Sequence, residues 1–240
     1  MIFRWIRRRL WGTKSSEQSP SHLKSVVILC GPEYPEEAAG LLGRALNNVS
    51  FPKEVEVFKE FGEGVTRERL EQILKQTEGT NQIKIFVGHG TDEALLGPDY
   101  AGCKGQLVES TAYSRLYDRD LVNTETGCLF AFCCNSAAEL GPYFSAAPGR
   151  TFLGFDNLIG YELSNEECVT VWTKIIQLIS EEIVRDGYVS ERHEESLRQL
   201  YTDAIDYFRN GDGKKNDSKL EMILCLINHK RFLKRFGGNA

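Results

Sequence analysis

The stretch Ile83–Gly90, IKIFVGHG, decides the fold class of this chain of 240 residues. Its first half is almost wholly apolar, as in a strand that is buried on both faces. It ends in a histidine between two glycines. A second run of the same kind, CLFAFCC at Cys128–Cys134, ends in two cysteines. In an open parallel sheet, ligands bind beyond the carboxyl ends of the strands. The histidine and the cysteines at the ends of these two runs are therefore candidate functional residues.

Other strands and helices alternate around these two runs. Strands are predicted at Ser25–Cys30, Val55–Phe61 and Thr151–Phe155, and apolar residues at helical spacing predict helices at 35–48 and Thr66–Glu78. Thr66 is a plausible N-cap, with Glu68 in the first turn. The alternation predicts a three-layer α/β sandwich with a mainly parallel sheet. The segment Thr91–Thr126 has few apolar clusters, and we expect a long functional loop region there.

The final third of the chain is predicted to be helical. Apolar stripes at helical spacing begin at Cys168 and Leu197, and a last helix begins at about Lys219. On this interpretation His193 and His229 lie on polar helix faces, where we expect them to be solvated. The chain then has three regions, which are a basic tail and polar linker at 1–24, a core at 25–162, and a helical C-terminal extension at 163–240 packed on the core.

Composition places the chain among soluble globular proteins. Hydrophobic residues make up 41% and charged residues 26%, and no apolar run is long enough to cross a bilayer. The seven cysteines are irregularly spaced and follow no secretory signal, which indicates reduced thiols in a cytoplasmic protein. Because no C-x-x-C pair occurs, a structural zinc site has little support.

Charge is unevenly distributed along the chain. Residues 1–14 carry five basic side chains and no acidic one, whereas the remaining residues hold 24 basic and 34 acidic side chains, a formal net charge of −10. A body this acidic repels a phosphate backbone, so nucleic acid is not an expected partner. Residues 1–12, MIFRWIRRRLWG, fit either a disordered basic tail or an amphipathic segment that makes weak contact with an anionic membrane surface.

His89 and Cys134 are the candidate catalytic residues. If their strands are neighbours, imidazole and thiol emerge at one edge of the sheet, as a Cys–His nucleophile pair requires. An adjacent imidazole can lower a thiol pKa and maintain a reactive thiolate. The backbone N–H groups of Gly90 and Cys134 could then bind an oxyanion. Taken singly, a buried cysteine or histidine at a strand end is more often structural.

Three motifs carry a resemblance to a known superfamily. KIFVGHG resembles the histidine strand of the caspase-like cysteine peptidases, and LFAFCCNSA resembles their cysteine strand, closest to the style of the CHAT peptidases. GRTFLGFDNLIGY is similar to the strand that follows the cysteine in that branch. The resemblance covers roughly Ser25 to Leu163. It implies a caspase-like sandwich and a cysteine endopeptidase that needs no cofactor or metal and cleaves a protein or peptide substrate, with Cys134 as nucleophile and His89 as base and acid. Prokaryotic relatives of this kind often act in antiviral defence.

One position departs from the metacaspase pattern, in which an acid two residues before the nucleophile binds a basic substrate side chain. This chain has Phe132 there, and Cys133 fills a slot usually held by a small or polar residue. Acids elsewhere, such as Asp92, Glu93 or Asp156, could supply the missing charge. The candidate substrate-pocket residues are therefore Phe132, Cys133, Asp92 and Asp156.

Two alternatives stay open. A non-catalytic interaction or scaffold module can use the same α/β fold, although such a module requires neither the histidine nor the cysteine. A zinc site built from His89, Cys103, Cys133 and Cys134 is less favoured, because adjacent cysteines rarely direct both sulfurs to one metal. No G-x-S-x-G, G-x-G-x-x-G or G-x-x-x-x-G-K-[ST] motif occurs, which disfavours serine acyl hydrolases and nucleotide-binding classes. The sequence predicts no oligomeric state.

Overall fold

A computed structural model describes residues 23–30, 45–77, 81–98, 113–122, 126–210 and 217–237. The basic tail, Cys103 and most of the helix expected at 35–48 lie outside the described residues.

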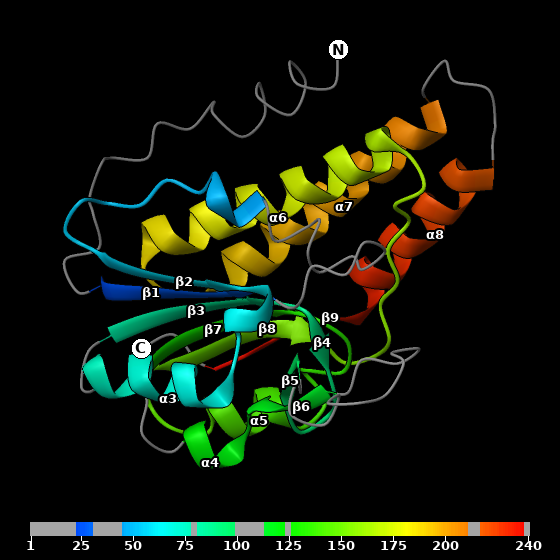
Figure 1. Cartoon of the computed structure of the whole chain (residues 1–240). Coiled ribbons are helices and arrows are strands. Elements are labelled where there is room, and N and C mark those ends of the chain that lie inside the picture. The colour runs from blue at the N-terminus through cyan, green and yellow to red at the C-terminus, as the bar shows by residue number, and fades with distance from the viewer. Residues whose placement is uncertain are drawn as a thin grey trace.

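A six-stranded sheet forms the centre of the molecule, in the order β2-β1-β3-β7-β8-β9 (Figure 1). Its strands are β1 (Leu23–Cys30), β2 (Glu56–Phe61), β3 (Asn81–Val87), β7 (Thr126–Phe132), β8 (Arg150–Phe155) and β9 (Leu233–Phe236). The first five strands in this order pair in parallel, and β9 is antiparallel to β8. The predicted mainly parallel sheet is therefore confirmed.

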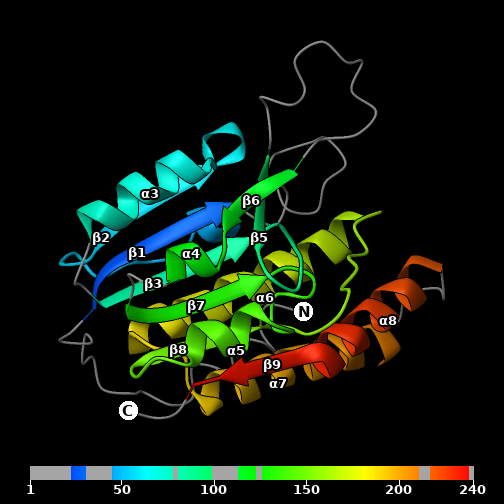
Figure 2. The same ribbon diagram turned by 90° about the horizontal axis from the view of Figure 1, so that it is seen from below.

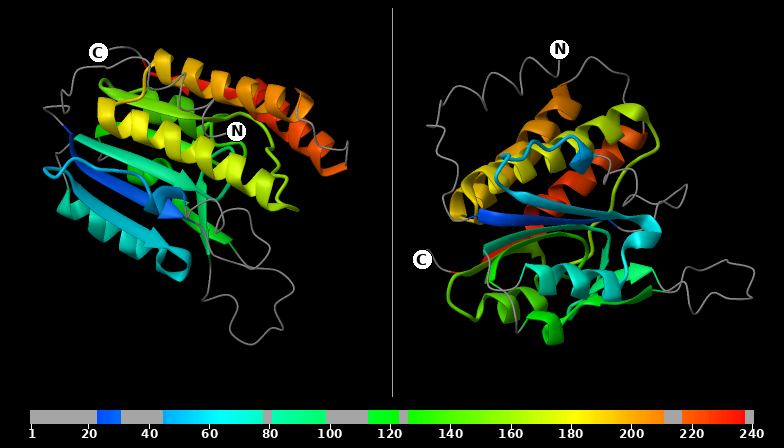
Figure 3. Two further views of the ribbon diagram at one scale, coloured as in Figure 1. Left: turned by 90° about the horizontal axis from the view of Figure 1, so that it is seen from above. Right: turned by 60° about the vertical axis from the view of Figure 1, so that its left-hand side comes forward.

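Helices cover both faces of the sheet, which gives three layers (Figures 1 and 3). One face carries α6 (Glu166–Asp186), α7 (Glu191–Asn210) and α8 (Asp217–Phe232). The other carries α3 (Arg67–Gln76), the short α4 (Arg119–Val122) and α5 (Leu140–Ser145). A single 3-10 turn, η1 (Gly62–Gly64), joins β2 to α3. Thr66 caps α3 as expected, because its hydroxyl accepts a hydrogen bond from the Arg69 amide at 3.2 Å.

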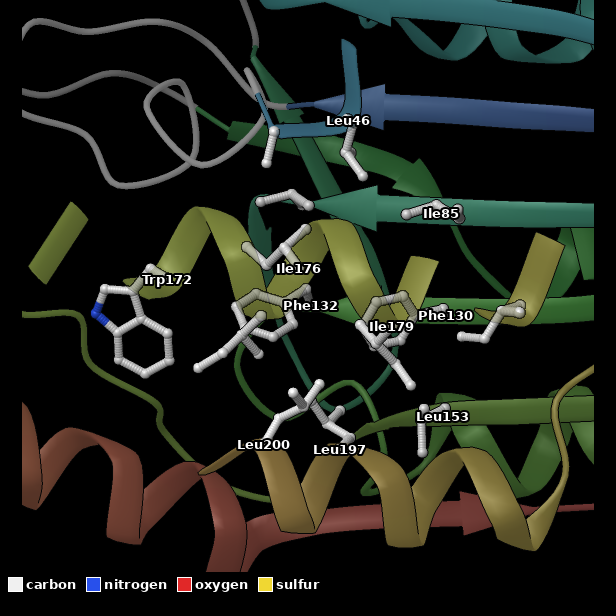
Figure 4. Packing of buried hydrophobic residues seen from close by; sticks show 14 of the residues in the cluster. Leu46, Ile85, Phe130, Phe132, Leu153, Trp172, Ile176, Ile179, Leu197 and Leu200 are labelled. Carbon is white, nitrogen blue, oxygen red and sulfur yellow. The ribbon is translucent and has the colours of Figure 1, made fainter. Parts of the chain in front are cut away.

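Alternate residues of each central strand enter two separate hydrophobic clusters. In β7, Phe130 and Phe132 pack toward α6 and α7 (Figure 4). Leu129 and Ala131 belong to the other cluster and pack with residues of α3 and α5. All four of these side chains are at most 1% exposed. Burial on both faces explains why the strands are continuous apolar runs and do not alternate with polar residues.

The region expected to be a long loop contains a second sheet. The strands β4 (His89–Gly90), β5 (Leu95–Pro98) and β6 (Tyr113–Tyr117) pair antiparallel beside the carboxyl ends of the central strands (Figure 2). The expectation of a long loop over Thr91–Thr126 was therefore wrong where the structure describes β5 and β6. His89 also does not close β3 as expected, because that strand ends at Val87 and the chain turns into β4.

The C-terminal region is not wholly helical, because it ends in β9, which completes the edge of the sheet beside β8. The short sequence LKRF gave no strand pattern, since two of its four residues are basic. Among the described residues, no helix has both the length and the apolar character that a bilayer crossing requires.

Candidate active site

Parallel pairing of β3 with β7 brings the two candidate catalytic residues to one edge. Val87, the last residue of β3, pairs with Phe132, the last residue of β7. The Gly88 amide donates a hydrogen bond to the Phe132 carbonyl at 3.5 Å, which continues the pairing past the strand ends. His89 and Cys134 each follow a member of this pair by two residues. The neighbouring strands that the hypothesis required are therefore present, with their carboxyl ends in register (Figure 2).

Gly90 packs directly on the segment that carries the two cysteines. A Cβ atom at this position would lie 2.6 Å from the Cys134 carbonyl oxygen and 2.7 Å from the Cys133 sulfur. Since real Cβ atoms essentially never approach so closely, only glycine allows this backbone contact. The strand that begins with His89 is thereby held in van der Waals contact with the candidate nucleophile's own backbone.

The chain makes a tight turn directly after Cys134. Asn135 has φ of 55°, and it is the only non-glycine residue with positive φ among those described. Asparagine tolerates this left-handed conformation better than most residues. The Asn135 amide donates to the Asn157 carbonyl at 3.2 Å, and the Ala137 amide donates to the Phe155 carbonyl at 2.9 Å. The turn is thus anchored to the end of β8, and uncommon backbone geometry of this kind is often found at functional sites.

The Cys134 side chain is half-buried and lies against the segment that follows β8. Its Sγ atom lies 3.3 Å from the Ile159 amide nitrogen and 3.4 Å from the Ile159 carbonyl oxygen. A thiol can donate to that carbonyl and accept from that amide. A thiolate can only accept, so the Ile159 N–H is the group that would stabilise the ionised sulfur.

Cys133 has a different environment, although it is the adjacent residue. Its side chain is 1% exposed and packs in the cluster on the α3 and α5 face of the sheet. Burial raises the pKa of its thiol far above the ordinary value, against a weaker lowering by the hydrogen bond with Ser136. A thiol of this kind is inert at neutral pH. The contrast favours Cys134 over Cys133 as the reactive sulfur.

The four candidate pocket residues do not gather into one surface. Phe132 is fully buried among core rings, and Cys133 is buried on the opposite face, so neither side chain can contact a substrate without rearrangement. Asp92 lies exposed near the candidate edge, where its carbonyl accepts hydrogen bonds from the amides of Glu139 and Leu140 at 3.2 and 2.8 Å. Asp156 is already engaged, because its carboxylate lies 3.4 Å from the Lys234 ammonium group.

Two histidines expected to be solvated are fully buried, and this expectation was wrong. The Nδ1 atom of His193 lies 3.0 Å from the Ser190 amide, and Nε2 lies 3.2 Å from the Asp186 carboxylate. His229 faces the core beneath the segment that contacts Cys134. A sequence signal for His229 existed, because Met222, Leu226 and His229 recur at helical spacing and all three are buried. Its immediate neighbours in the sequence NHKR are all polar, and they made this apolar face of the helix hard to recognise.

The two candidate oxyanion donors lie side by side. Gly90 and Cys134 are in contact at the edge of the sheet, and the chain direction of β4 is fixed by its antiparallel pairing with β5. Among the described residues, no group of three or more histidine, cysteine or acidic side chains is arranged to hold a metal ion. Cys103, the fourth ligand of the zinc alternative, lies outside those residues.

The chain matches no protein-family model, and no curated protein is significantly similar to it.

Proposed function

We propose that the chain is a caspase-like cysteine endopeptidase that cleaves a protein substrate through a Cys134–His89 dyad. The observation that carries the proposal is the parallel register of β3 and β7, which ends both strands at one edge and sends His89 and Cys134 out from it. Three further observations support it, which are the tight turn at Asn135, the close backbone contact at Gly90 and the burial of Cys133.

The proposed reaction has two steps. His89 takes the thiol proton of Cys134, and the resulting thiolate attacks the carbonyl carbon of the scissile peptide bond. The oxyanion that forms is bound by the N–H groups of Gly90 and Cys134. His89 gives a proton to the leaving amine, which departs and leaves a thioester on Cys134. A water molecule then loses a proton to His89 and attacks the thioester, which releases the carboxylic acid product and the Cys134 thiolate. His89 returns its proton to the sulfur, and the thiol is restored.

Cellular roles follow only from the resemblance. A small peptidase of this superfamily in a prokaryote would cut a dedicated protein target, as in antiviral defence. The acidic body of the chain fits a cytoplasmic enzyme that does not bind nucleic acid, with residues 1–12 as a weak contact to a membrane surface.

Alkylation kinetics test the dyad without knowledge of the substrate. Iodoacetamide is applied at pH 7, and the modified cysteines are mapped by mass spectrometry. We expect Cys134 to react fastest, and His89→Ala to slow its modification about tenfold or more, because the thiolate is the reacting species. Cys225 is an internal reference, since it is half-buried and desolvation raises the pKa of its thiol. Equal rates for Cys134 in the two proteins would favour the interaction-module alternative.

Peptide cleavage is the second test. A proteome-derived peptide mixture is incubated with the native protein, and new termini are identified by mass spectrometry. Cys134→Ala should abolish the new termini, whereas Cys133→Ala, which removes the neighbouring buried sulfur, should retain them. Cleavage that survives Cys134→Ala would rule out the proposed nucleophile.

A further inference from the structure

His229 is a fully buried histidine enclosed by aromatic rings. It belongs to α8, and the surrounding rings come from two strands, the segment after β8 and two other helices. The ring centroids lie 4.6 to 5.6 Å from that of His229, and the rings are those of Phe132, Phe155, Tyr161, Trp172 and Tyr201. An apolar side chain would pack here at no desolvation cost, whereas a buried imidazole costs free energy unless it is hydrogen-bonded. We therefore expect a polar partner for the ring.

That polar contact is the Gly160 carbonyl. Nε2 of His229 lies 3.0 Å from the Gly160 oxygen, and Nδ1 lies 3.5 Å from the Tyr201 hydroxyl. A carbonyl oxygen can only accept, so Nε2 carries the hydrogen and Nδ1 is the acceptor for the tyrosine hydroxyl. Burial lowers the pKa of His229 to about 3, and the ring is therefore neutral at physiological pH.

Gly160 directly follows the residue that contacts the candidate nucleophile. The Ile159 amide donates to Cys134 Sγ at 3.3 Å, and the carbonyl of the following residue, Gly160, is the one that His229 contacts. This segment follows β8 and is neither helix nor strand, so it lacks a hydrogen-bonded ladder that would fix it. The contact from α8 fixes the chain one residue beyond the amide that faces the sulfur.

We propose that His229 is a positioning residue for Cys134, because its bond to the Gly160 carbonyl holds the Ile159 N–H against the sulfur. That N–H stabilises the thiolate more than the thiol, since a thiolate accepts the stronger hydrogen bond. The inference rests on the proposed role of Cys134 as nucleophile. It assigns to the C-terminal extension a part in the reaction that the core alone does not supply.

Two substitutions separate positioning from packing. His229→Phe keeps a ring of similar size in the aromatic cluster and removes the donor. His229→Gln retains an amide N–H that can reach the place of Nε2. We expect His229→Phe to slow Cys134 alkylation at pH 7 about threefold to tenfold, the effect of losing one hydrogen bond, and to displace the rate–pH profile to higher pH. His229→Gln should restore most of the rate.

His193→Phe is the matched control. His193 is equally buried, but it lies near the start of α7, and its polar contacts are with Ser190 and Asp186 rather than with the Cys134 segment. This variant should lower the melting temperature and leave the rate–pH profile of Cys134 alkylation unchanged. A matching displacement in His193→Phe would show that the effect of His229→Phe is general destabilisation, and the inference would fail.

Hydrogen exchange at the Ile159 amide separates this inference from the proposed function. If His229 holds the segment, protection of that amide falls about threefold or more in His229→Phe and is retained in His229→Gln, whether or not Cys134 is activated. Unchanged protection in His229→Phe overturns the inference, even if alkylation is fast. Slow alkylation of the native protein that does not depend on His89 would instead overturn the proposed function and leave the exchange result to decide on positioning.

Discussion

Gly90 and Cys134 are in contact through their backbones, and no side chain fits between them. A Cβ at residue 90 would lie 2.6 Å from the Cys134 carbonyl oxygen, a backbone atom that cannot swing aside as a flexible side chain can. Gly90→Ala must therefore push β4 away from the backbone of Cys134. We expect it to slow Cys134 alkylation about tenfold and to cost about 1–3 kcal/mol of unfolding free energy.

Gly64→Ala is the control for that substitution. Its added methyl group would meet only the end of the flexible Glu60 side chain, at 3.0 Å. Both variants are compared by urea unfolding and by the alkylation rate at pH 7. If Cys134 of the Gly90→Ala variant is alkylated at the native rate, the close packing of β4 on Cys134 does not affect the reactivity of this thiol.

Asn135 carries the left-handed turn that follows Cys134, with φ of 55°. Residues with a Cβ pay about 1–2 kcal/mol for this conformation, and glycine does not. We expect Asn135→Gly to be as stable as the native protein or nearly so, and Asn135→Ala to be less stable by about 1 kcal/mol. Both variants keep the amide that donates to the Asn157 carbonyl. The difference between their free energies of unfolding in urea therefore reports the cost of the left-handed backbone at this position. Equal stability of the two variants would contradict the assignment of strain.

The ion pair between Arg67 and Asp118 joins α3 to the chain just after β6. Nη1 of Arg67 lies 2.7 Å from Asp118 Oδ2, and the Asp118 side chain is only 8% exposed. Burial raises the pKa of this carboxyl, but the hydrogen bond and charge of Arg67 outweigh it, and the net pKa lies below its usual value. Its stabilising effect is therefore complete above the ordinary pKa of about 3.9 and is lost as the pH falls through the lower folded value.

Asp118→Asn should accordingly cost about 1–3 kcal/mol at pH 7, and the cost should shrink in strong acid. The exposed pair Arg115–Glu93 is the comparison, with 61% and 48% of the two side chains exposed. Glu93→Gln should change the unfolding free energy by at most about 0.5 kcal/mol. Urea unfolding of both variants at pH 7 and pH 3 measures these losses of unfolding free energy. Equal losses in the two variants would show that the burial of Asp118 does not strengthen its ion pair.

The central sheet was predictable from sequence because burial on both faces leaves a direct pattern. Runs such as Ser25–Cys30 and Cys128–Cys134 are apolar at nearly every position, and all five predicted strands are present within a few residues. Parallel pairing of β3 with β7 also places the residues that follow the two strands, His89 and Cys134 among them, at one edge of the sheet. Short elements escaped prediction, because β4 has two residues and β9 has four, too few to show a period.

The surroundings of the candidate nucleophile were less accessible to sequence reasoning. Nothing in the string CCN indicates that Cys133 faces the core while Cys134 faces Ile159, since that depends on where β7 ends. The contact of His229 with Gly160 joins residues 69 positions apart, and only the packing of α8 on the sheet brings them together. The polar appearance of the helix around His229 led to the opposite expectation.

The buried His229 also predicts a specific sensitivity to acid. Its folded pKa of about 3 lies below the value of about 6.5 expected in the unfolded chain, so the unfolded state takes up a proton first as the pH falls. This residue therefore leaves stability unaffected above pH 6.5 and lowers it by up to about 1.4 kcal/mol per pH unit between pH 6.5 and pH 3. His229→Gln has no titrating ring, so its stability should fall less steeply over the same range. Urea unfolding of the two proteins at pH 7.5, 6 and 5 measures the difference, in which the contributions of the shared carboxylates cancel. Parallel curves for the two proteins would show that the ring is accessible to protons in the folded state, and they would contradict its enclosure by the aromatic cluster.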